Sequence, residues 1–115
     1  MHDLQDKIVS WLFETGAVKV SHPDEPFWYT SGTIGPYYCN THYLYGGSDK
    51  AERLLDIIDS AVHDKLKCPV IIMNEVGRNY YSGGIYKQLV DEMVGFIDDR
   101  IGLDNIDVIS GGERR

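Results

Sequence analysis

Three stretches of the chain carry apolar residues at helical spacing, and we expect each to form an amphipathic helix. They are residues 3–15, 49–66 and 85–100. Their apolar positions are Leu4, Ile8, Trp11, Leu12 and Phe13 in the first, Leu54, Leu55, Ile58, Val62 and Leu66 in the second, and Ile85, Leu89, Met93, Phe96 and Ile97 in the third. Gly16 directly follows the first helical pattern and Gly102 lies two residues after the third, and both are typical stop signals.

The remaining apolar runs are too short for this periodicity. AVKV at 17–20 favours a strand, and FWYT at 27–30 and PYYCNTHYLY at 36–45 favour two extended segments joined by a tight loop. Residues 69–76, PVIIMNEV, suit either a helix or a strand. We favour a helix, because Asn74, Glu75 and Asn79 are unsuited to a buried strand. Residues 106–110 predict a short apolar strand that runs into a glycine pair.

These elements together predict an α+β fold in a single, incomplete domain over residues 1–115. Residues 1–48 would form one segment, and residues 49–115 would hold the further helices and a first core strand. A buried strand followed by glycines normally opens a βαβ unit, and ligands collect at the carboxyl end of such a strand. We therefore expect an α/β domain to continue beyond Arg115.

Net charge and composition narrow the classes of partner. The formal charge of −7 disfavours a nucleic-acid partner, which needs a basic surface, and it disfavours an acidic membrane surface. No apolar run approaches the roughly 20 residues that span a bilayer. The start of the chain does not resemble a signal peptide, so we expect a cytoplasmic protein in which Cys39 and Cys68 are free thiols.

Neither a metal site nor a catalytic nucleophile stands out. The four histidines are scattered, and Cys39 with His42 forms a single pair where a structural zinc site needs two. Ser31 and Ser82 lie in glycine-flanked turns, without the strand–turn–helix pattern of a nucleophile elbow. We predict no metal ligand and identify no catalytic residue.

The stretch FWYTSGTIGPYY at 27–38 has the strongest candidate chemistry. Flat heterocycles are bound by aromatic rings, hydroxyls, backbone amides and small residues that let the backbone approach. Ser31, Gly32, Gly35, Tyr37 and Tyr38 supply these groups. The same residues suit a hairpin that packs on a core, and composition does not separate the two interpretations.

The spacing F-x-x-x-S-G-x-x-x-P-Y-Y from Phe27 to Tyr38 resembles the N-terminal substrate motif of orotate phosphoribosyltransferases. The lead-in FETGAV at 13–18 also resembles that family. The resemblance is specific over residues 8–45, looser to residue 66, and returns weakly at 107–112. It implies a type I phosphoribosyltransferase-like fold in which residues 1–48 form a small aromatic β hood over the base.

The resemblance further implies transfer of a phosphoribosyl group from phosphoribosyl pyrophosphate to orotate, with magnesium on the phosphates. By position, the substrate-binding residues would be Thr30, Ser31, Gly32, Pro36, Tyr37 and Tyr38, with Arg114 and Arg115 toward pyrophosphate. Guanidinium groups suit phosphate oxygens. We expect magnesium only with a full-length phosphate site, and none bound by this chain.

Departures from the family pattern keep two alternatives open. Thr30 stands where the family usually has lysine, Gly35 replaces a serine, and the acidic pair followed by threonines and glycine is absent. The chain would therefore be the inactive front part of an enzyme. Alternatively, it is a non-catalytic module that binds a small-molecule base or nucleotide, or that forms a homodimer through its aromatic surface.

Overall fold

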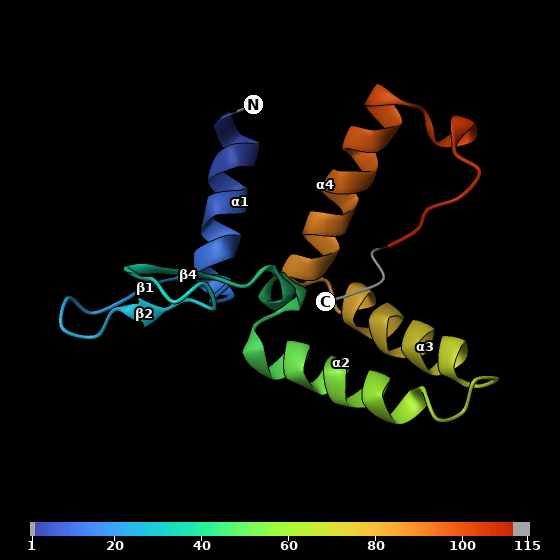
Figure 1. Ribbon diagram of the computed structural model, residues 1–115. Helices are drawn as coiled ribbons and strands as arrows, with labels where there is room; N and C mark the ends of the chain where they lie inside the picture. The colour runs from blue at the N-terminus through green and yellow to red at the C-terminus, as the bar shows by residue number, and fades with distance from the viewer. Residues whose placement is uncertain (1, 112–115) are drawn as a thin grey trace.

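The computed structural model describes residues 2–111 of the chain (Figure 1). Within them lie four α-helices: α1 (His2–Glu14), α2 (Ser48–Ala61), α3 (Cys68–Tyr81) and α4 (Ile85–Arg100). The strands are β1 (Val18–Val20), β2 (Phe27–Trp28), β3 (Ile34–Gly35) and β4 (Tyr37–Cys39), and the 3₁₀ helices are η1 (Thr41–Tyr45) and η2 (Leu103–Asn105). This is the α+β fold that the sequence predicts.

The four strands form two separate antiparallel ladders. β1 pairs with β4, with Val18 opposite Cys39 and Val20 opposite Tyr37, and β2 pairs with β3. Two extended segments joined by a tight loop were predicted, and this is correct in part. β2 and β4 lie in the two segments, but the second half of the loop is itself a strand, β3. β4 instead pairs with the strand that follows α1, so the β layer is attached to the N-terminal helix (Figure 1).

Residues 41–45 were predicted to be extended, but they form the 3₁₀ helix η1. The side chain of Asn40 accepts a hydrogen bond from the His42 backbone N–H at 3.1 Å, which caps the first turn. Gly46 and Gly47, both at positive φ, then turn the chain into α2. η1 contacts α1, α2 and α4, so this short helix connects the β layer to the helices.

The second helix is shorter than the predicted range of 49–66, because α2 ends at Ala61. The Asp64 carboxylate accepts hydrogen bonds from the backbone N–H groups of Leu66 and Lys67, both at 3.2 Å. An aspartate that binds the next N–H groups competes with helix continuation. Leu66, assigned by periodicity to the buried stripe, is consequently exposed.

The helix predicted over 69–76 is confirmed as part of α3. Pro69 lies in its first turn, where the missing N–H costs nothing. α3 lies beside α2 along the lower part of Figure 1, and α4 follows after a three-residue turn. The predicted helix over 85–100 is confirmed as α4, and Gly102, at φ 86°, follows its end.

The strand predicted over 106–110 is not formed. These residues have no strand partner among residues 2–111, and Ile109 is 81% exposed. A strand needs a neighbour to satisfy its backbone groups, and none of the described elements supplies an edge here. The opening strand of an α/β domain is therefore absent from the described fold.

The buried core is small and divided. Trp11, Thr15 and Ala17 are buried where α1 meets β1, and the Thr15 hydroxyl donates to the Trp11 carbonyl at 2.7 Å. Ala51 and Ala61 are buried on α2. Both cysteines are free thiols, as predicted, with Cys39 exposed and Cys68 partly buried.

Candidate functional site

The motif stretch folds into the β2–β3 hairpin with Thr30, Ser31 and Gly32 at its tip. The Tyr29 N–H donates to the Thr33 carbonyl at 2.8 Å, and the Gly32 N–H donates to the Tyr29 carbonyl at 3.0 Å. Gly32 has a φ of 86°, a conformation that strongly favours glycine. The turn therefore requires a glycine at this position of the motif.

The hydroxyl groups of the tip point to one another. Ser31 Oγ and Thr33 Oγ1 are 2.9 Å apart, and both side chains are exposed. Thr30, also exposed, adds a third hydroxyl to the same turn. A ligand at the tip would meet neutral hydrogen-bonding groups, because lysine is absent from this turn.

Gly35 lets an aromatic ring approach the backbone. A Cβ at this position would lie 2.8 Å from Cε2 and 2.9 Å from Cζ of Tyr29. The Tyr29 hydroxyl passes this point and donates a hydrogen bond to the Tyr37 carbonyl. Tyr29 thus ties the hairpin to β4, and Gly35 lies at a position where a side chain would meet the Tyr29 ring.

Pro36 follows β3 directly, and Tyr37 and Tyr38 are the first two residues of β4. The Tyr38 ring lies against Phe27, with ring centroids 5.7 Å apart. The Tyr37 ring is 61% exposed. Since successive strand residues point to opposite faces, the side chains of Tyr37 and Tyr38 lie on opposite faces of β4.

The structure brings the predicted site residues onto one hairpin and the strand after it, but not into one closed pocket. Thr30, Ser31 and Gly32 form the tip, while Pro36, Tyr37 and Tyr38 form the base. Among the described residues, no hydrogen bond joins Ser31 to Tyr37 or Tyr38. Arg114 and Arg115 lie outside the described residues.

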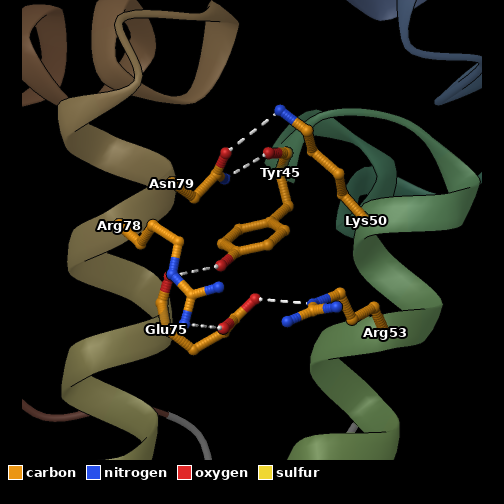
Figure 2. Close-up of polar contacts among 6 residues, drawn as sticks. All are labelled: Tyr45, Lys50, Arg53, Glu75, Arg78 and Asn79. Carbon is orange, nitrogen blue, oxygen red and sulfur yellow. Dashed lines mark hydrogen bonds and ion pairs between the residues drawn. The ribbon is translucent and has the colours of Figure 1, made fainter.

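A second group of polar residues lies between η1, α2 and α3 (Figure 2). The Glu75 carboxylate on α3 forms two ion pairs. One oxygen lies 3.0 Å from Arg53 Nε of α2, and the other lies 3.3 Å from an Arg78 Nη. Asn79 donates to the Tyr45 carbonyl at 2.6 Å and accepts from Lys50 Nζ at 3.4 Å. Together with Tyr45 and Ser82, these residues line a cavity of about 210 Å³. We call it the arginine cavity.

Electrostatics in the arginine cavity follow from these contacts. The hydrogen bond from Arg53 and the two nearby guanidinium charges hold the pKa of Glu75 below its ordinary value. Burial of the phenol, and secondarily the charge of Glu75, raises the pKa of Tyr45. Glu75 is therefore a carboxylate at neutral pH, and Tyr45 is a neutral phenol that donates to the Glu75 carbonyl at 3.4 Å.

Sequence reasoning did not identify the arginine cavity. Glu75 and Arg78 are three residues apart on one helix, and this local pair is visible in the sequence. Arg53 lies 22 positions before Glu75, and only the packing of α2 on α3 brings them together. The polar character of Asn74, Glu75 and Asn79 was the available signal, and it indicated a helix but not its partner.

Residues 2–111 contain no group of three or more histidine, cysteine or acidic side chains that could hold a metal ion. None of its helices has both the length and the apolar character needed to cross a membrane.

Comparisons of the chain with models of protein families, with curated proteins and with solved structures gave no match.

Proposed function

We propose that this chain is the N-terminal, base-binding part of an orotate phosphoribosyltransferase-like enzyme of the cytoplasm. The complete enzyme would convert orotate and phosphoribosyl pyrophosphate to orotidine monophosphate and pyrophosphate, in pyrimidine nucleotide synthesis. Since the sequence lacks the acidic pair and the threonine–glycine loop of the family, we expect this chain alone to be inactive.

The observation that carries the proposal is the shape of the motif stretch. It forms a hairpin with an exposed Ser31–Gly32 tip, and the Tyr37 ring is largely exposed at its base. A residue that served only packing would bury its ring, because aromatic burial is a major source of stability. Exposed rings beside hydroxyls and an open backbone are the groups that hold a flat base.

In the proposed reaction the residues of this chain position the base. Hydroxyl groups of the tip would accept and donate hydrogen bonds to the ring substituents of orotate, and a tyrosine face would limit its tilt.

Orotate binding tests this function. Orotate should raise the melting temperature of the 115-residue chain, and Tyr37→Ala should abolish that shift. This substitution removes the ring but keeps the Tyr37 carbonyl that accepts the Tyr29 hydroxyl, so the hairpin should stay attached to β4.

Tyr81→Ala is the matched control, because Tyr81 is an exposed tyrosine at the end of α3, outside the hairpin. The control should keep the full orotate shift. Absence of an orotate shift in the unmodified chain, or an equal loss in both variants, would contradict the proposal.

A second function is favoured by another exposed pair on the same hairpin. Trp28 and Ile34 are cross-strand partners, and Trp28 is 77% exposed. Exposed aromatic rings of this kind commonly lie in protein interfaces. In this alternative the hairpin is a non-catalytic ligand-binding or dimerisation module. If it is a dimerisation module, Trp28→Ala would change the oligomeric state, and orotate would leave that state unchanged.

A further inference from the structure

We propose that the arginine cavity binds the phosphoryl group of a small ligand, held by Arg53, Arg78 and Lys50. The site is separate from the hairpin, and the inference does not depend on the proposed function. Figure 2 shows the three cationic side chains and the one carboxylate, Glu75, around the space between α2 and α3.

The first argument is local charge. Three cations and one carboxylate line the cavity, which gives a formal charge of +2 in a chain whose net charge is −7. If the cluster served only to join α2 to α3, one arginine would neutralise Glu75. Like charges brought together repel one another, and an anion bound between them would relieve that repulsion.

The second argument is the supply of donors. A guanidinium group has five N–H donors in a planar fork, which matches the oxygens of a phosphate. Within residues 2–111, the side-chain contacts of Arg53 and Arg78 go to Glu75, through one nitrogen each. The two side chains are 60% and 70% exposed, so their other donors are accessible to a ligand.

The third argument is positioning. Glu75 is only 12% exposed, and each of its oxygens holds one arginine. Asn79, fixed by its bond to the Tyr45 carbonyl, orients Lys50 through its amide oxygen. The cations are therefore held in place before a ligand arrives, which reduces the entropy lost on binding.

The size of the cavity fits a single small anion. Its volume of about 210 Å³ is well above the roughly 10–15 Å³ that a cavity needs to hold one water. Ser82 lies at its wall, where its hydroxyl donates to the Asn79 carbonyl at 2.6 Å. Such dimensions admit a phosphate or diphosphate group and leave a larger attached group in solvent.

Titration of the 115-residue chain with inorganic pyrophosphate, followed by calorimetry at constant ionic strength, tests the proposal. We expect saturable binding at one site. The double variant Arg53→Gln with Arg78→Gln should weaken it at least about tenfold, since each charge-assisted hydrogen bond contributes strongly to affinity. Arg100→Gln is the matched control, because Arg100 lies at the far end of α4 over the Phe96 ring, and it should leave binding unchanged.

Glu75→Gln tests whether the affinity for pyrophosphate rises or falls when the one negative charge of the cavity is removed. It removes the negative charge that competes with an anion, and this gain should exceed the loss of arginine positioning, so pyrophosphate should bind about fivefold more tightly. If the cluster only joined the helices, this variant would gain no affinity. Lys50→Gln, which leaves the Glu75 contacts intact, should weaken binding and covers the case in which the double variant does not fold.

The kind of ligand that carries the phosphoryl group can be identified by comparing the affinities of the chain for inorganic phosphate and for ribose 5-phosphate. Tighter binding of the first would indicate a free oxyanion, and tighter binding of the second a sugar phosphate. Both results support the site. No saturable binding beyond the effect of chloride, or equal binding by the unmodified chain and the double variant, would overturn it.

Discussion

Gly35 shows how one backbone position sets the shape of the hairpin. The Tyr29 ring lies where a Cβ of residue 35 would be, and the Tyr29 hydroxyl continues to the Tyr37 carbonyl. Gly35→Ala should therefore push the ring aside and break that hydrogen bond. Overpacking of this kind costs about 1–3 kcal/mol. The unfolding midpoint in urea, measured with tyrosine fluorescence, should fall accordingly.

Gly95→Ala is the matched control for this prediction. Gly95 lies within α4, and a Cβ there would meet no atom within 4 Å. Alanine is favoured over glycine in a helix by about 1 kcal/mol, so this variant should be more stable than the unmodified chain. If both substitutions changed stability in the same direction, the close approach of Tyr29 to Gly35 would not be the cause.

Residues of the hairpin could be predicted from the sequence better than those of the arginine cavity. An open turn is predicted by Ser31, Gly32 and Gly35, because serine and glycine have local backbone preferences. Arg53 and Glu75 have no such local signature, since their contact depends on how two helices pack. The close approach of Tyr29 to Gly35 is likewise a tertiary detail, although the glycine itself indicated that some group comes near.

At the scale of elements, the prediction was most accurate where periodicity extends over several turns. α4 follows its pattern over the whole of 85–100, and the Asp98 carboxylate accepts from the Leu103 backbone N–H only beyond its end. α2 ends before its pattern does, because Asp64 binds the N–H groups of Leu66 and Lys67. η1 forms inside an aromatic run because the Asn40 cap and Gly46 favour a turn over the strand propensity of tyrosine.

The contact between α2 and α3 should depend on pH through Glu75. Its folded pKa lies below its ordinary value of 4.5, so it contributes stability that is complete above 4.5 and is lost as the pH falls through the folded value. The melting temperature of the unmodified chain should exceed that of Glu75→Gln at pH 7. The difference should shrink toward zero under acid conditions, when Glu75 is protonated and resembles glutamine.

Asp91 on α4 titrates in the same direction and must be separated from Glu75. Hydrogen bonds from Lys87 and Tyr80 lower its pKa, so its contribution is also lost in acid. Asp91→Asn with Glu75→Gln should therefore flatten the acid side of the profile more than either change alone. Glu92→Gln, an exposed neighbour on α4, is the control. A Glu75→Gln difference that stays constant from pH 7 to pH 3 would contradict the role given to the Arg53–Glu75 contact.

At the scale of the whole molecule, the chain is more open than a typical domain of its mass. Its accessible surface is 9257 Å², whereas a compact 13.0 kDa protein exposes about 6,300 Å². Its radius of gyration is 16.8 Å, against about 13 Å for a compact chain of this length. Large apolar side chains on α1, α3 and α4 are exposed, among them Phe13, Val70 and Phe96. Such a surface is typical of polypeptide that packs against more protein.

We expect a second copy of the chain to cover part of this surface. Val108 and Ile109 are about four-fifths exposed in a segment with apolar character and unpaired backbone, and an open strand-like segment of this kind tends to associate with another edge. Light scattering after size exclusion should give the mass of a dimer, and the double variant Val108→Lys with Ile109→Lys should shift it toward the monomer. Leu66→Lys, at another fully exposed apolar position, separates a specific effect from a general gain in charge and should leave the dimer intact. A monomer at every concentration would exclude the homodimer.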